Sequence, residues 1–117
     1  MAYENLKQRT KQFALSIIRM VENLPETNTS KIIGNQIVRS ATSVAANYRA
    51  GCLAKSKRDF ISKMKIVEEE CDETIFWLEL VNDLGYFQPE KITQIKTEGS
   101  EIFFIIVASI KTARKNQ

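Results

Sequence analysis

The residues best suited to chemistry in this chain are a group of carboxylates, and they are Glu68, Glu69, Glu70, Asp72 and Glu73. Carboxylate oxygens are the ligands that hard cations such as Ca²⁺ and Mg²⁺ prefer. Lys65, however, precedes Glu68 and Glu69 by three and four residues, which is the spacing of ordinary ion pairs on a helix surface. We therefore expect solvated helix pairs here, not a metal site.

Catalytic constellations are also missing from the sequence. The 117 residues include no histidine, so neither a Ser-His nor a Cys-His pair is possible. The Glu-x-x-His ligand pairs of di-iron bundles cannot form either. Cys52 and Cys71 are the only cysteines, too few for a disulfide framework or a zinc site, and we expect buried or half-buried free thiols. We expect no enzyme, no cofactor and no metal.

The order of the charges is more informative. One block is rich in basic residues and contains a single acidic one, Asp59; its basic members are Arg49, Lys55, Lys57, Arg58, Lys63 and Lys65. Residues 68–83 then carry seven acidic residues and no basic one. The basic block could bind phosphates, as clustered Lys and Arg do for any polyanion. It could instead meet the acidic part of a neighbouring subunit and set the register of an assembly, or simply be a solvated face.

Composition places these residues in one helical domain over residues 1–117. Hydrophobic residues make up 44% and charged residues 26%, with four Gly and two Pro, which disfavours both disorder and a turn-rich β fold. The net charge of +3 is only mildly basic. The longest apolar run, residues 102–108, is too short to cross a bilayer, and no targeting segment is visible. We expect a soluble, cytoplasmic protein without a membrane partner.

Periodicity predicts four helices. The first covers residues 5–24 and ends before Pro25, and a loop over residues 26–29 follows. Thr29 or Ser30 is expected to cap the second helix, and Gly51 to mark its end or a break. Its core positions are Ile33, Ile37, Ala41, Val44 and Tyr48, and a stripe of small residues, Ser40, Ser43 and Asn47, would let another helix approach closely.

The third and fourth helices have clearer start and stop signals. Ser56 and Asp59 resemble a capping box, and Gly85 stops a helix over residues 56–84. The fourth helix begins near Pro89, a favourable first-turn residue. Short loops between four such helices predict an all-α fold, an antiparallel up-down-up-down four-helix bundle.

Two segments carry more apolar surface than one core stripe requires. Residues 75–78 are apolar around most of the third helix, as residues 102–107 are around the fourth. In a domain this small, the second apolar side is expected to meet another subunit. We predict a homo-oligomer with Phe76, Trp77, Phe103 and Phe104 at the interface; the alternative is a monomer with an exposed aromatic patch. Trp77 lies in an apolar run, which favours a core position over base stacking.

Two stretches carry a family resemblance: RSATSVAANYRAG at residues 39–51 and DFISKMKIVEEECDETIFWLEL at residues 59–80. They resemble the bacterial four-helix-bundle family typified by the protein encoded in the intervening sequence of 23S rRNA. That family is similar to the accessory protein of diversity-generating retroelements, a pentameric barrel with a basic surface that binds nucleic acid and a reverse transcriptase. The resemblance therefore implies a pentamer and a nucleic-acid or protein partner, whereas association with ribosomes or retroelements does not follow from a shared fold.

The chain departs from the family pattern near the end of the second helix. Where the intervening-sequence type reads Ser-Ile-Pro-Ser-Asn-Ile-Ala-Glu-Gly, residues 43–51 have Ala45 in place of the proline and Arg49-Ala50 in place of Ala-Glu. We expect no proline kink here, and the local charge is reversed. The predicted function is a non-enzymatic homo-oligomer whose basic block binds RNA or DNA with low sequence specificity. The alternative is a protein-interaction scaffold without a nucleic-acid role.

Overall fold

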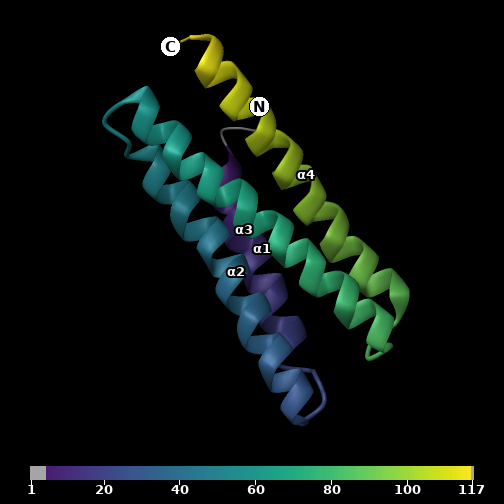
Figure 1. Ribbon diagram of the computed structural model, residues 1–117. Coiled ribbons are helices and arrows are strands. Elements are labelled where there is room, and N and C mark those ends of the chain that lie inside the picture. The colour runs from purple at the N-terminus through teal and green to yellow at the C-terminus, as the bar shows by residue number, and fades with distance from the viewer. Residues whose placement is uncertain (1–4, 117) are drawn as a thin grey trace.

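Four α-helices make up the computed structural model, which describes residues 5–116 and contains no strand among them (Figure 1). The helices are α1 (Leu6–Val21), α2 (Asn28–Cys52), α3 (Lys57–Leu84) and α4 (Pro89–Lys115). Each packs most closely against its neighbours in sequence, and α1 also contacts α4. The helices form an elongated bundle of 47 × 23 × 20 Å, with successive loops at alternating ends (Figure 1). The all-α class is confirmed.

Pro25 shortens the first helix by more than expected. α1 ends at Val21, three residues before the predicted end at Leu24. A proline ring clashes with the carbonyl four residues earlier, here that of Val21, so the helical pattern cannot continue up to Pro25. Asn23 and Leu24 instead donate from their backbone N–H groups to carbonyls three residues back, at 3.0 and 3.1 Å.

The second helix begins earlier than expected, and its cap is a different residue. α2 starts at Asn28, and Thr27 caps it, not Thr29 or Ser30. The Thr27 hydroxyl accepts a hydrogen bond from the Ser30 backbone N–H at 3.1 Å. Thr27 has the extended backbone angles, φ −127° and ψ 161°, that a capping residue needs.

Gly51 does not end α2. The helix continues to Cys52, and among residues 5–116 the positive φ angle belongs to Gly85 alone. Gly51 is buried where α2 meets α3, and a Cβ there would collide with the Cε methyl group of Met64. The glycine therefore allows a close helix approach, and the predicted helix end or break at this residue is wrong, since α2 continues one residue further. α2 runs through Ala45 as one helix.

The remaining helix ends agree with the sequence. Ser56 accepts from the Asp59 backbone N–H at 3.0 Å at the start of α3. Gly85 follows α3 with φ 74°, the left-handed conformation that glycine adopts without a steric penalty. Pro89 is the first residue of α4, where its missing N–H is no loss.

One hydrophobic core joins all four helices. The five predicted core positions of α2 are buried. On α3 the buried core residues include Met64, Val67, Cys71, Leu78 and Val81, and Phe60 packs partly buried against them. On α4 the buried apolar residues are Ile92, Ile102, Ile106 and Ile110. The close helix contact predicted for the small-residue stripe of α2 is present at Ser40, because Ser40 and Thr74 of α3 are fully buried with their hydroxyl oxygens 2.8 Å apart.

Candidate nucleic-acid interface

The six predicted phosphate-binding residues lie around the turn that joins α2 to α3. Arg49 is in the last turn of α2, Lys55 is in the loop, and Lys57 and Arg58 open α3. These four are exposed, while Lys63 and Lys65, further along α3, are half-buried. The predicted cluster thus occupies one end of the bundle, at the upper left in Figure 1.

Two other helices bring further cations to this end, which sequence analysis did not anticipate. The Lys57 ammonium donates a hydrogen bond to the backbone carbonyl of Asn116, so the C-terminal end of α4 lies beside the start of α3. That end of α4 carries exposed Lys111, Arg114 and Lys115. On the other side, Arg49 lines a cleft together with Lys7 and Lys11 of α1. The sequence did contain a signal for this arrangement of cations. If helix directions alternate as predicted, the basic residues at the end of the fourth helix lie near the start of the third.

Most of these cations have no acidic partner within the described part of the chain. Lys65 pairs with Glu68 at 3.5 Å, the helix pair expected from their spacing. Among residues 5–116, Arg49, Lys55, Arg58 and Lys63 take part in no salt bridge. Their charges are therefore available to an outside anion, which is what phosphate binding requires.

Two carboxylates of α3, in contrast, are engaged with a basic side chain from another helix. Arg39 of α2 reaches across to α3, where it contacts Glu70 at 2.8 Å and also Glu73. The Trp77 indole N–H donates to the same Glu73 carboxylate at 3.0 Å. That hydrogen bond, followed by the one from Arg39, holds the pKa of the Glu73 carboxyl below its ordinary value. These contacts tie α2 to α3.

Pairing also explains what the other acidic residues do. Arg9 of α1 holds Glu98 of α4 through two hydrogen bonds, at 2.6 and 3.0 Å, and Lys96 pairs with Glu79 at 3.1 Å. Within residues 5–116, no group of three side chains of the metal-binding types lies close enough to hold an ion. Glu70, Glu73, Glu79 and Glu98 thus link neighbouring helices.

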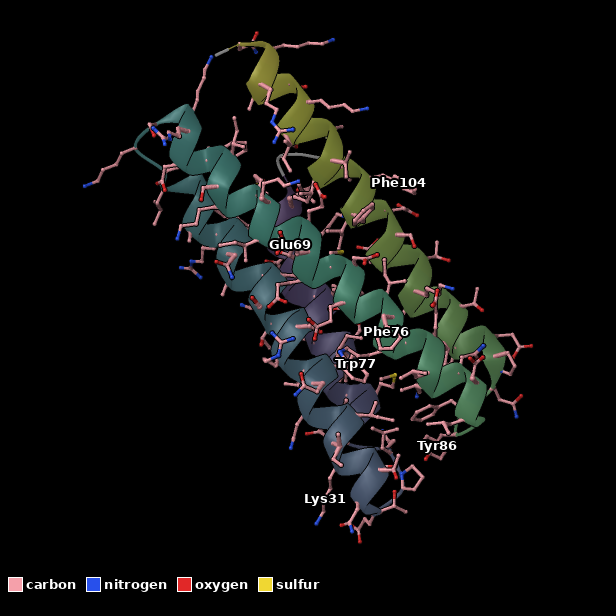
Figure 2. The ribbon with its side chains drawn as sticks, viewed as in Figure 1. Lys31, Glu69, Phe76, Trp77, Tyr86 and Phe104 are labelled. Atoms are coloured by element: carbon pink, nitrogen blue, oxygen red, sulfur yellow. The ribbon has the colours of Figure 1, made fainter. Side chains whose placement is uncertain are left out.

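The four aromatic residues predicted at an oligomer interface differ in exposure. Phe76 on α3 is 49% exposed and Phe104 on α4 is 68% exposed, and Figure 2 shows both on the side formed by these two helices. Trp77 and Phe103 are half-buried and pack against the core. The four rings form two edge-to-face pairs, Phe76–Trp77 with ring centroids 5.1 Å apart and Phe103–Phe104 with ring centroids 5.7 Å apart. Their role in assembly stays a prediction, while the core packing of Trp77 agrees with the sequence.

The two thiols have different environments. Cys71 is fully buried against α4, with its Sγ 3.2 Å from the Gly99 carbonyl oxygen. Burial raises the pKa of the Cys71 thiol to about 12. Cys52 is exposed at the last residue of α2, so the expectation of two buried or half-buried thiols is wrong for this one.

No described helix is long and apolar enough to cross a membrane.

These features together define a class: an all-α four-helix bundle with a cluster of cations at one end and several ion pairs that link its helices. The chain belongs to the 23S rRNA-intervening sequence protein family, whose sequence pattern matches residues 4–108. The family expected from residues 39–51 and 59–80 is thereby confirmed.

A solved structure supports the same assignment. It is the 1.70 Å crystal structure of a protein with unknown function from the S23 ribosomal protein family of Bacteroides thetaiotaomicron. The two chains are 33% identical, the match covers 90% of this chain and 97% of that chain, and the TM-score is 0.84. Neither description names an enzyme. The comparison with curated proteins finds no match.

Proposed function

We propose that this protein is a non-enzymatic homo-oligomer of antiparallel up-down-up-down bundles that binds RNA or DNA through its basic end with little sequence preference. One observation carries the proposal: the loop after α2, the start of α3 and the C-terminal end of α4 all bring exposed cations to the same end of the molecule. Clustered cations gain affinity by releasing counterions from a phosphate backbone. A pentamer, the number suggested by the family resemblance, would repeat this end five times around one rim.

Low sequence preference follows from the kind of side chain present. The basic end has Lys and Arg in abundance, whereas Tyr48 is buried in the core and Phe60 packs partly buried against it. Phosphate contacts position a nucleic acid without reading its bases, whereas base recognition needs stacking platforms or hydrogen bonds to base edges. The affinity for RNA or DNA should therefore depend on the length of the nucleic acid and on the salt concentration more than on its base sequence.

The test is binding of a fluorescently labelled mixed-sequence RNA, measured by anisotropy at about 50 and 200 mM salt. We expect clear binding at the lower concentration and a loss of affinity at the higher one. Binding no tighter than millimolar at low salt, or binding indifferent to salt, contradicts the proposal.

Matched charge reversals locate the site. Lys55→Glu with Lys63→Glu changes two cations of the basic end, and we expect affinity to fall by about tenfold or more. Lys31→Glu with Lys91→Glu makes the same change of net charge at the opposite end, where Figure 2 shows Lys31. This control should bind nearly as well as the wild type. Equal losses in both variants would mean that net charge alone is responsible.

The alternative is a scaffold whose partner is another polypeptide, such as a reverse transcriptase. The observation that favours it is the pair of exposed phenylalanines on α3 and α4, which are better suited to a protein surface than to phosphates. A protein that is oligomeric but fails to bind RNA at low salt supports the scaffold.

A further inference from the structure

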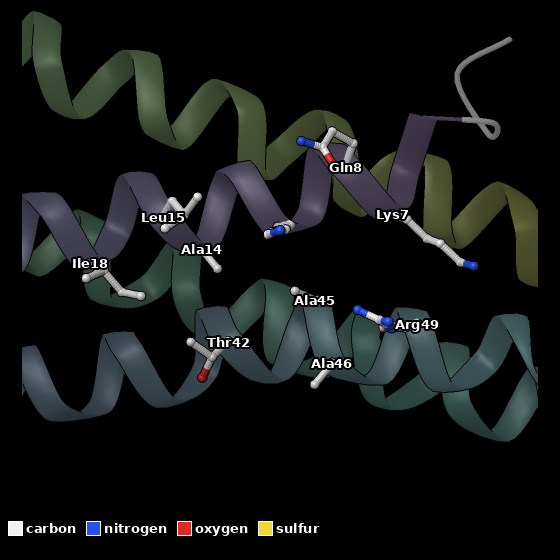
Figure 3. Close-up of a pocket in the computed structure, with 10 residues that line it drawn as sticks. Lys7, Gln8, Ala14, Leu15, Ile18, Thr42, Ala45, Ala46 and Arg49 are labelled. Atoms are coloured by element: carbon white, nitrogen blue, oxygen red, sulfur yellow. The ribbon is translucent and has the colours of Figure 1, made fainter.

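A cleft of about 620 Å³ lies between α1 and α2 and combines apolar and cationic walls. Figure 3 shows Leu15 and Ile18 towards one end and Lys7 and Arg49 towards the other, with Ala45 between them. Lys11 also lines the cleft. Lys7, Lys11 and Arg49 are exposed and form no salt bridge with a residue of the described range 5–116. An occupant of this cleft would need an apolar group and negative charges close to it.

The exposed face of α3 has the complementary composition. Its outward residues follow one another at steps of three and four, which places them on a single helix face, and they are Glu69, Asp72, Phe76, Glu79 and Asp83. We call this face the acidic stripe. Glu79 pairs with Lys96, whereas Glu69, Asp72 and Asp83 form no salt bridge within residues 5–116. Phe76 is the one aromatic residue among them, and Figure 2 labels it together with Glu69.

Charge decides what can cover Phe76. A two-fold contact between two acidic stripes would place carboxylates against carboxylates, and like charges brought together at an interface cost several kcal/mol. The partner surface must therefore be cationic and must offer an apolar recess for the ring. The α1/α2 cleft has both properties.

Size and position fit as well. Lys7 and Ile18 are eleven positions apart on α1, about 16 Å of helix, and Glu69 and Glu79 are ten positions apart on α3, about 15 Å. The cleft and the acidic stripe belong to different helices, so one molecule can use both at once. Contacts of this kind join unlike surfaces, and they close into a ring when the rotation between copies permits it.

We propose that the acidic stripe of one copy docks in the α1/α2 cleft of the next, with Phe76 on the apolar wall and the carboxylates beside Lys7, Lys11 and Arg49. The occupant of the cleft is thus a second copy of this chain. This interface rests on the proposed homo-oligomer and specifies that it is assembled head to tail.

The experiment measures particle mass by light scattering coupled to size exclusion, with helicity checked by circular dichroism. Lys7→Glu with Lys11→Glu reverses the cleft, and Glu69→Lys with Asp72→Lys reverses the acidic stripe. We expect each double variant to stay helical while the concentration needed for assembly rises by about tenfold or more. The quadruple variant carries opposite charges on both surfaces again and should regain the wild-type mass. Lys31→Glu with Lys91→Glu is the control and should assemble normally.

Phe76→Ser tests the apolar half of the contact separately. Because Phe76 is half exposed in one copy, its replacement should leave the bundle folded and weaken the assembly. Double variants that keep the full mass, or a quadruple variant that stays dissociated, overturn the interface while leaving the oligomer intact. A cleft variant that keeps its mass but loses RNA binding also overturns it, because the cleft then serves nucleic acid. A wild-type monomer overturns the oligomer itself.

Discussion

Glu73 links a charged residue of a neighbouring helix to an aromatic residue that packs against the core. It accepts hydrogen bonds from Trp77 on its own helix and from Arg39 on α2. Both contacts favour the ionised carboxylate, so the pKa of Glu73 is lower in the folded protein than its ordinary value of 4.5. Such a group stabilises the fold above its unfolded pKa, and that contribution is lost as the pH falls through the lower folded value.

Glu73→Gln should therefore destabilise the protein at pH 7 and make little difference in acid. The side chain is 35% exposed, so solvent screening limits the loss in the free energy of unfolding at pH 7 to about 1 kcal/mol or less. Urea unfolding followed by circular dichroism at pH 7, and again at a series of pH values falling well below the ordinary pKa of 4.5, measures it. Glu26→Gln, at an exposed loop position, is the control and should show no such dependence. A deficit that persists unchanged in acid would contradict the assignment.

The two cysteines should differ sharply in reactivity. The thiolate is the reactive form, and burial that raises the pKa of Cys71 to about 12 leaves almost none of it near neutral pH. Cys52 is exposed to reagent. Titration of the native protein with a disulfide reagent should modify one thiol quickly and the second only after unfolding. In Cys52→Ser the fast step should vanish; two fast thiols in the wild type would show that Cys71 is accessible.

At the scale of the elements, the helix ends depend on single residues with identifiable roles. Gly85 ends α3 with φ 74° and has open space around the position of a Cβ. Backbone conformation, not crowding, is therefore what requires glycine there.

Gly85→Ala should lower the free energy of unfolding by about 1 kcal/mol, because an L-residue in the left-handed region carries that penalty. Gly85→Asn should cost less, since Asn adopts this conformation more readily than Ala does. Denaturant unfolding of the two variants compares them directly. Equal stability of the alanine variant and the wild type would mean that the turn relaxes without cost.

Close helix contacts have a different origin from helix ends. Position 51 requires a glycine because Met64 of α3 lies against it. Gly99 of α4 faces the Phe13 ring, whose Cζ would be 3.1 Å from an added Cβ. Both glycines sit inside helices, where glycine is ordinarily unfavourable. The gain from close packing of the helices offsets that disadvantage.

For the whole molecule, assembly and stability should be linked. The proposed oligomer binds only folded chains, so association stabilises the native state by mass action. Raising the protein concentration roughly a hundredfold should therefore raise the Tm measured by circular dichroism. The variant Lys7→Glu with Lys11→Glu, which weakens the proposed contact, should show a smaller dependence. A wild-type Tm independent of concentration contradicts association in this range.

The elements of this fold were largely determined by the sequence because helix formation is governed by neighbours along the chain. Periodic apolar residues, Ser56, Gly85 and Pro89 predicted α3 and α4 correctly, and the family followed from residues 39–51 and 59–80. The errors came where local signals compete: Pro25 shortened α1, and Thr27 became the cap of α2.

Only the tertiary structure decided which side chains meet. Arg39 reaching Glu70 and Glu73, the cleft shared by Lys7 and Arg49, and Lys57 beside Asn116 all join residues from different helices. Such meetings depend on the direction and rotation of each packed helix, which are set by the fit of the core and not by sequence spacing. For the same reason, the exposure of Cys52 and the burial of Gly51, adjacent in the chain, could be told apart only once α3 was in place.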